Sequence, residues 1–162
     1  MRSRPPPATL SAMTTTTDTP AAHLAAVGSI YEAFGRGDLD ALVEPLADDV
    51  SWDADWGQHF AQKAGLDMFR PRRGKADARE FFESLAPFEV HDFQVLDMLA
   101  SERQVVVQIV IELSYPNGGR YRDEELHLWT FNADGTISAL RHYVDTAKHI
   151  AAAGGEDTTK RP

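Results

Sequence analysis

The spacing of hydrophobic residues changes near Pro87, and this change constrains the fold more than any other feature of the chain. Before Pro87, apolar side chains recur at every third or fourth position, which is typical of helices that bury one face. After it come four segments rich in β-branched and aromatic residues, at 89–99, 104–113, 121–131 and 136–145. Such segments predict strands. We therefore expect helices first and a sheet second.

Three helices are expected before Pro87. The first has Thr19 as its N-cap and Pro20 at its first helical position. The second begins at Asp38, whose carboxylate can accept hydrogen bonds from the backbone amides of the first turn. The third follows Gly74. A short strand at 47–52 and an irregular loop at 53–73 separate the second helix from the third, and a loop of that length in a compact domain is usually functional or mobile.

The connections between the later segments indicate how the strands pair. Residues 116–119 read Pro-Asn-Gly-Gly and residues 132–135 read Asn-Ala-Asp-Gly, and both sequences favour tight hairpins. The strands should therefore form an antiparallel meander. Helices that are separate in sequence from an antiparallel sheet define an α+β domain. The compact arrangement is a sheet that wraps around the helices and leaves a pocket at its open end.

One domain is expected, at residues 21–150. Residues 1–20 are rich in Pro, Thr and Ser and have little to bury, so we expect a disordered tail, with Met13 as an alternative start to Met1. Residues 151–162 are small and then charged. They predict a second flexible tail.

Composition excludes several classes of function. The chain has no Cys, so it has no disulfide, thiolate metal site or cysteine nucleophile. Its net charge of −9 opposes binding to nucleic acid and to anionic lipid. No apolar stretch approaches the roughly 20 residues of a membrane helix. We expect a cytoplasmic protein with neither nucleic acid nor membrane as a partner.

Three segments, 30–52, 74–82 and 126–146, carry a family resemblance in their order and spacing. The last contains an Asp-Gly turn and ends in Arg141, Tyr143 and Asp145. Together they resemble the SnoaL-like and ketosteroid-isomerase-like proteins of the NTF2-like superfamily, over about residues 22–150. The resemblance implies a cone of three N-terminal helices packed in a strongly curved antiparallel sheet, and a homodimer formed through the convex face. The superfamily holds isomerases, polyketide cyclases, epoxide hydrolases, dehydratases and non-catalytic binding modules.

The resemblance implies two acid/base residues. His127 matches the position where ketosteroid isomerase keeps a protonated carboxylic acid, and an imidazole there could donate to a carbonyl oxygen or move a proton. Its structural alternative is a half-buried histidine bonded to a neighbour. Asp145 resembles the aspartate of the cyclase and epoxide-hydrolase branches. Its structural alternative is the N-cap of a short helix at 146–150.

Two of the isomerase's groups are out of register here. Asp53 and Asp55 follow the first strand, but the position of the catalytic base falls on Ala54. The position of the oxyanion tyrosine falls on Ile30, with Tyr31 one step away. This argues against steroid isomerisation, unless a bulge turns one of the flanking carboxylates inward. An apolar pocket remains expected.

Aromatic walls with a few polar groups suit a flat apolar ligand. Arg141 could instead form a cross-strand ion pair with Glu125, which we interpret as structural. The side chains expected to bind substrate are Tyr31, Trp52, Asp53, Trp56, His59, Trp129, Arg141 and Tyr143.

No metal or cofactor is expected. His59, His127 and His142 do not form a His-x-x-x-His pair, and we expect the latter two on different faces or strands. Our first hypothesis is a cofactor-independent enzyme that uses His127 and Asp145 for acid/base chemistry on a small apolar carbonyl or epoxide substrate. This chemistry covers cyclases, isomerases and hydrolases. The alternative is a non-catalytic ligand-binding or dimerisation module. An open cavity at these residues favours the enzyme, and a closed network favours the module.

Overall fold

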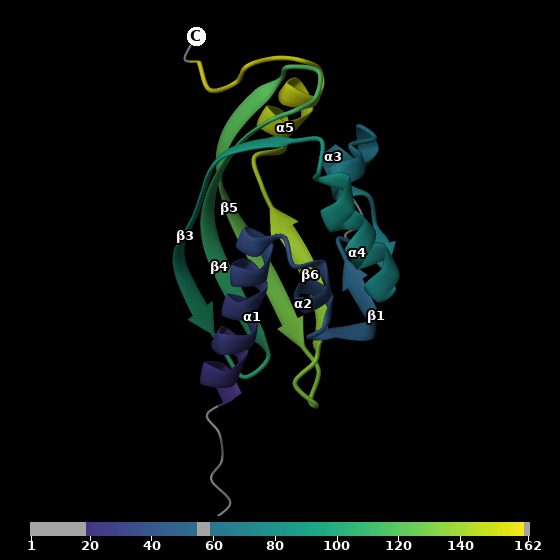
Figure 1. Ribbon diagram of the computed structural model, residues 1–162, viewed down its shortest axis with the longest axis vertical. Coiled ribbons are helices and arrows are strands. Elements are labelled where there is room, and N and C mark those ends of the chain that lie inside the picture. The colour runs from purple at the N-terminus through teal and green to yellow at the C-terminus, as the bar shows by residue number, and fades with distance from the viewer. Residues whose placement is uncertain (1–18, 55–58, 161–162) are drawn as a thin grey trace, which may run out of the picture.

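The computed structural model describes residues 19–54 and 59–160, so most of the expected N-terminal tail and Trp56 lie outside the described residues. Helices and strands alternate at first and the long strands follow, as Figure 1 shows. The elements in chain order are α1 (Thr19–Arg36), α2 (Leu39–Val43), β1 (Leu46–Trp52), α3 (Phe60–Lys63), η1 (Asp67–Phe69), β2 (Arg72–Arg73), α4 (Gly74–Ser84), β3 (Glu89–Ala100), β4 (Gln104–Ser114), β5 (Arg120–Phe131), β6 (Ile137–Tyr143) and α5 (Thr146–Ala153).

The strands within the described ranges form one sheet in the order β2-β1-β6-β5-β4-β3. The predicted meander is confirmed, because β3 to β6 pair antiparallel in sequence order. One pair departs from the antiparallel pattern, because β1, the neighbour of the edge strand β2, pairs parallel to β6. These two strands are far apart in sequence, so no hairpin forces them to run in opposite directions.

The sheet is curved because its strand pairing is interrupted at defined places. The register of β3 against β4 shifts between Val90 and Asp92 and again between Val95 and Asp97, and such bulges bend a strand. In Figure 1 the sheet bends around α1, and α5 lies across the end opposite the N-terminus of α1.

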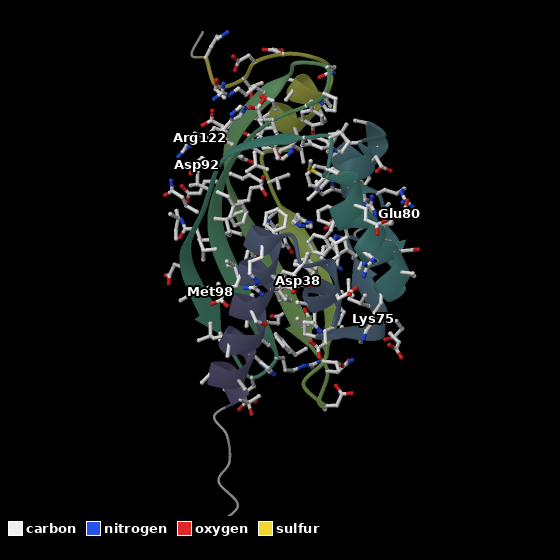
Figure 2. The ribbon with its side chains drawn as sticks, in the orientation of Figure 1. Asp38, Lys75, Glu80, Asp92, Met98 and Arg122 are labelled. Carbon is white, nitrogen blue, oxygen red and sulfur yellow. The ribbon has the colours of Figure 1, made fainter. Side chains whose placement is uncertain are left out.

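The predicted helices are present as α1, α2 and α4. In α1, Val27, Ile30 and Ala33 are buried at helical spacing. The carboxylate of Asp38 accepts a hydrogen bond from the Ala41 amide at 3.1 Å and so caps α2 (Figure 2). In α4, Phe81 packs on the core with a ring centroid 5.1 Å from that of Trp52. Burying one such side chain stabilises the fold by about 1.5–3 kcal/mol.

The segment at 53–73, expected to be irregular, contains α3, η1 and β2. A buried guanidinium organises its second half. Arg72, only 1% exposed, donates to the carbonyl oxygens of Asp67 and Arg70, each at 3.0 Å. A buried polar group must be hydrogen-bonded, and the backbone of this segment folds around the donor.

The C-terminal segment, expected to fray from residue 151, instead lies along the sheet up to the last described residues. The Arg120 amide donates to the Glu156 carbonyl at 3.0 Å, and the Thr158 amide donates to the Arg120 carbonyl at 2.8 Å. Gly119 allows this close approach, because a Cβ at that position would lie 1.7 Å from the Ala152 carbonyl oxygen. The helix expected at 146–150 thus extends to Ala153 as α5.

Candidate functional site

An apolar cavity of about 90 Å³ lies between the inner face of the sheet and helices α1 and α4. Aromatic rings form most of its wall, among them Phe34, Trp52, Phe81, Phe93 and Trp129. Its polar groups come from α1 and from two neighbouring strands, and they include Tyr31, Tyr121, Glu125, His127 and His142. A mostly apolar cavity with a few converging polar groups is the usual form of a small-molecule site.

Tyr31, His127 and Glu125 form the first polar chain in this wall. On β5, alternate residues from Tyr121 to Phe131 face inward, which places Glu125 and His127 on the same face as Trp129. The Tyr31 hydroxyl lies 2.6 Å from His127 Nδ1, and His127 Nε2 lies 3.3 Å from Glu125 Oε2.

The hydrogen-bond donors assign the direction of this chain. Trp129 Nε1 can only donate, and it donates to the Tyr31 oxygen at 3.3 Å. The Tyr31 hydroxyl is therefore free to donate to His127 Nδ1. With Glu125 ionised, His127 Nε2 carries the proton and donates to that carboxylate.

Asp53 and His142 form the second polar pair. His142 Nδ1 lies 2.6 Å from Asp53 Oδ2, and the His142 amide donates to Asp53 Oδ1 at 2.9 Å. Asp53 is fully buried and has a φ of 49°, a left-handed backbone conformation that a short polar residue tolerates. A carboxylate flanking Ala54 does turn inward, but it contacts His142 and leaves His142 Nε2 as the ring nitrogen available to a ligand.

His127 and His142 lie directly opposite each other on β5 and β6. Their ring centroids are 4.6 Å apart, in an edge-on arrangement. The two residues are on different strands, as expected, but on the same face. The site therefore brings together two imidazoles, each hydrogen-bonded to its own buried carboxylate.

The two imidazoles have opposite pKa shifts. Burial, together with the nearby positive charge of His142, lowers the pKa of His127. Burial also acts to lower the pKa of His142, but the charge and hydrogen bond of Asp53 outweigh it and raise that pKa above its ordinary value. Between the two pKa values, His127 is neutral and His142 is protonated.

The second oxygen of Glu125 is held by α5. His149 Nε2 lies 3.1 Å from Glu125 Oε1 and 3.6 Å from Asp123 Oδ2. Burial would raise the pKa of Glu125, but the hydrogen bonds from His127 and His149 lower it to about 2. Glu125 is therefore ionised at neutral pH.

Asp145 has the structural role that was the alternative to catalysis, as the N-cap of the helix that follows it. Its carboxylate caps α5, accepting from the amides of Ala147 at 3.2 Å and Lys148 at 3.4 Å, and its side chain is 48% exposed. Asp145 is not among the residues that line the cavity. The predicted pairing of His127 with Asp145 is therefore not formed, and the carboxylate beside His127 is that of Glu125.

Arg141 and Tyr143 lie on the outer face of the sheet rather than in the cavity. The physical reason is a register shift between Thr130 and Phe131. Phe131 pairs with Ile137. If the pairing continued from there without the shift, Arg141 would lie opposite His127. The extra residue sets His142 there instead, and a slip of one residue exchanges the two faces of a strand. Arg141 lies opposite Leu128, so the predicted ion pair with Glu125 is not formed.

Of the remaining residues predicted to bind substrate, some line the cavity and others do not. Tyr31, Trp52 and Trp129 line the cavity. Asp53 does not line the cavity but is hydrogen-bonded to His142, which does. Trp56 lies outside the described residues. His59 lies beside the cavity wall, with its ring centroid 5.3 Å from that of Phe69.

Sequence reasoning missed His142, Glu125 and His149 as site residues. The alternation of β5 could have found Glu125, since it lies two residues before His127. His142 depends on the bulge, and turn chemistry alone does not reveal it. His149 comes from a helix that packs on the end of the sheet, so no local pattern indicates it.

Within residues 19–54 and 59–160, Asp123, Glu125 and His149 form the one group whose ligand atoms, all within 4.8 Å of one another, could hold a metal ion. The Lys148 ammonium already lies 3.0 Å from Asp123 Oδ1, and His149 Nε2 is hydrogen-bonded to Glu125 and lies 3.6 Å from Asp123 Oδ2. A metal ion would have to displace the Lys148 ammonium and the Nε2 proton of His149, so the group fits an internal ion-pair network better than a metal centre.

The fold is shared with solved structures of low sequence identity, whereas no protein of curated function matches the sequence. An NTF2-like protein from Burkholderia xenovorans has a TM-score of 0.68 at 18% identity, over 82% of this chain and 96% of that chain. SalBIII, an epoxide hydrolase/cyclase-like enzyme of pyran ring formation in the polyether salinomycin, has a TM-score of 0.60 at 21% identity, over 78% and 92%. The Δ5-3-ketosteroid isomerase of Mycobacterium sp. has a TM-score of 0.57 at 20% identity, over 75% and 92%.

These likenesses confirm the NTF2-like cone predicted from the sequence. The family model described as the SnoaL-like domain matches residues 27–140, which is more than half of the chain. This chain therefore belongs to the SnoaL-like domain family.

Proposed function

We propose that this protein is a cofactor-independent enzyme that uses two histidines for acid/base chemistry on a small apolar carbonyl or epoxide substrate. One observation carries the proposal. His127 and His142 lie with ring centroids 4.6 Å apart in the wall of an apolar cavity, and each is oriented by a separate buried carboxylate. Neighbouring titratable groups whose environments move their pKa values apart are the usual mark of an acid/base pair.

In this proposal the proton acceptor is His127, acting through Tyr31. The Tyr31 oxygen takes a proton from the substrate, and Tyr31 passes its own proton to His127 Nδ1 in the same step. Burial raises the pKa of Tyr31, so a separate tyrosinate is disfavoured and the transfer is best concerted. Glu125 stabilises the resulting imidazolium.

The proton donor is His142. Its Nδ1 is held by Asp53, so Nε2–H is the group that can donate to a carbonyl or epoxide oxygen. Such donation stabilises the negative charge that develops on that oxygen. This assignment gives His142 the role that the sequence suggested for Asp145. The similarity of the fold to SalBIII, an epoxide hydrolase/cyclase-like enzyme, and to the mycobacterial ketosteroid isomerase supports this class of reaction.

The size of the cavity sets a limit on the ligand. At about 90 Å³ it is smaller than the cavity of about 150 Å³ that holds benzene in an engineered protein. Met68 and Phe88 line both this cavity and a neighbouring pocket of about 350 Å³. A larger ligand could extend toward that pocket by displacing these two side chains, and an unbranched Met is well suited to such a movement.

The test uses exchange of α-protons in small cyclic ketones, followed by NMR in deuterated water. The wild type should catalyse exchange, and Tyr31→Phe should lower the rate by about 10²-fold or more, because it removes the proton relay. Tyr143→Phe removes the same hydroxyl from the outer face and should leave the rate unchanged. Equal rates in wild type and Tyr31→Phe would contradict the proposed relay.

The second candidate is a non-catalytic ligand-binding module. It is favoured by the fact that both nitrogens of His127 are already engaged, by Tyr31 and Glu125. Small apolar ketones would then raise the melting temperature of the protein, since they bind only its folded state, but would show no exchange.

We also propose a homodimer formed through the outer face of the sheet. Leu99, Leu126 and Tyr143 are 66%, 45% and 43% exposed, and the pairing of β3 to β6 places them on that same outer face. We further propose a cytoplasmic location. No helix in the described part of the chain is long and apolar enough to cross a membrane.

A further inference from the structure

His149 is a fully buried histidine that reaches the proposed site from α5 without lining the cavity. Its Nε2 contacts the same carboxylate that orients His127, so Glu125 lies between two imidazoles at 3.1 Å and 3.3 Å. We infer that His149 is a positioning residue, which supplies the positive charge that the buried Glu125 requires and so leaves His127 as a neutral proton acceptor. This inference rests on the proposed function.

Burying Glu125 has a free-energy cost. The residue is 5% exposed, and a buried carboxylate needs an opposite charge or several donors to remain ionised. Among the described residues, two groups within hydrogen-bonding distance can provide a charge, His127 and His149. If His149 provides it, His127 can donate a neutral N–H and keep Nδ1 as an acceptor.

The surroundings favour His149 as the charged member. It faces two carboxylates, Asp123 and Glu125, whereas His127 faces Glu125 and the positively charged His142. His149 Nδ1 has no hydrogen-bond partner among the described residues, so the two carboxylates at Nε2 must offset the cost of a buried Nδ1–H without an acceptor if the ring is charged. In agreement, Asp123 and Glu125 outweigh burial and raise the pKa of His149.

The other titratable groups near this network come from several elements, and the test must take them into account. Those near His149 and Glu125 are Tyr121, Asp123, Lys148, Asp145, Tyr115 and His59, and those near His127 are Tyr31, His142 and Asp53. Within the described part of the chain, Glu125 alone is in hydrogen-bonding distance of both His127 and His149.

The same contacts hold α5 in place. His149 packs between Phe69 and Tyr121, with ring centroids at 5.1 Å and 4.0 Å. Asp123, its second carboxylate partner, accepts from the Asp145 amide at 2.7 Å at the start of α5. The docking of α5 and the charge state of His127 are therefore connected through one pair of carboxylates.

The test is an NMR titration of the imidazole nitrogens of the full chain, compared between wild type and His149→Gln. Glutamine keeps a donor for Glu125 but removes the charge. The pKa of His127 should then rise by about one unit, because His127 becomes the only cation that can neutralise Glu125. Lys148→Gln is the matched control, since it removes a neighbouring positive charge that contacts Asp123 and not Glu125, and it should shift His127 much less.

An unchanged pKa of His127 in folded His149→Gln would overturn the inference, as would an equal shift in Lys148→Gln. If His149→Gln fails to fold, Glu125→Gln in the presence of His149 decides the matter. Loss of Glu125 should lower the pKa of His149, and an unchanged value would show that the two are not coupled. Because the titration needs no turnover, a shift in His127 without ketone exchange would leave this inference standing while the proposed function fails.

Discussion

At the scale of single residues, the unusual backbone conformation of Asp53 positions His142 in the wall of the cavity. Asp53 adopts a positive φ at the end of β1, and this turns its carboxylate back toward β6. The buried carboxylate then holds His142 in one ring orientation, with Nε2 directed away from the pair. A strained residue that positions a cavity-lining group is a common arrangement at functional sites.

Asp53→Asn tests the ion pair through stability. The folded pKa of His142 is raised, so the stabilisation from the pair is fully present below the unfolded pKa of histidine and is lost as pH rises through the folded value. The variant should lose about 1.5–3 kcal/mol in acidic buffer, and less above the folded pKa. Urea unfolding at several pH values measures this difference. Asp49→Asn, an exposed carboxylate on the same strand, is the control, and a pH-independent loss in Asp53→Asn would argue against the ion pair.

At the scale of elements, α5 can pack closely on the sheet because Gly119, in the turn before β5, has no side chain. A Cβ at Gly119 would clash with the Ala152 carbonyl oxygen, so any other residue would push α5 away. Asn117, in the same turn, donates from Nδ2 to the Ala153 carbonyl at 2.7 Å. Both contacts fix the helix that carries His149.

Gly119→Ala should therefore displace α5 and destabilise the protein by about 1–3 kcal/mol, in the range of overpacking substitutions. Gly28→Ala, in the middle of α1, has nothing within 4 Å of its new Cβ and should stabilise by about 0.5–1 kcal/mol. Thermal unfolding of the two variants compares the same chemical change with opposite expected signs. A neutral Gly119→Ala would show that α5 is not held by this contact.

The elements were largely predictable from sequence, and the site only in part. Turn chemistry at 116–119 and 132–135 identifies the meander, and the cap at Asp38 identifies α2, because these signals are local. His127 was predicted to face the cavity through the family resemblance. His142 was not, because one extra residue in the ladder near Phe131 decides which face it takes. His149 depends on how a helix docks on the sheet, which local patterns do not encode.

At the scale of the whole molecule, helices cover the inner face of the sheet, whereas its outer face carries exposed apolar side chains. Charged pairs border this outer face, such as Arg122 and Asp92 at 2.7 Å, which lie side by side in Figure 2. An exposed apolar patch with a polar rim is typical of an interface between protein chains.

Sedimentation analysis tests the proposed dimer. The wild type should sediment as a dimer, and Leu126→Glu should shift it toward monomer by placing a charge in the contact. Ile150→Glu, on α5 and away from this face, is 36% exposed and should leave the dimer unchanged. A monomeric wild type at all accessible concentrations would refute the dimer.

If a neutral His127 and a protonated His142 act together, the rate of ketone exchange must depend on the charge of both rings, and its pH profile can be measured. Exchange needs a pH above the pKa of His127, which is lowered, and below the pKa of His142, which is raised. We predict a bell-shaped profile in the wild type and loss of its alkaline limb in His142→Gln, with a reduced rate. A His142→Gln variant that keeps both limbs and the full rate would show that His142 is not the proton donor.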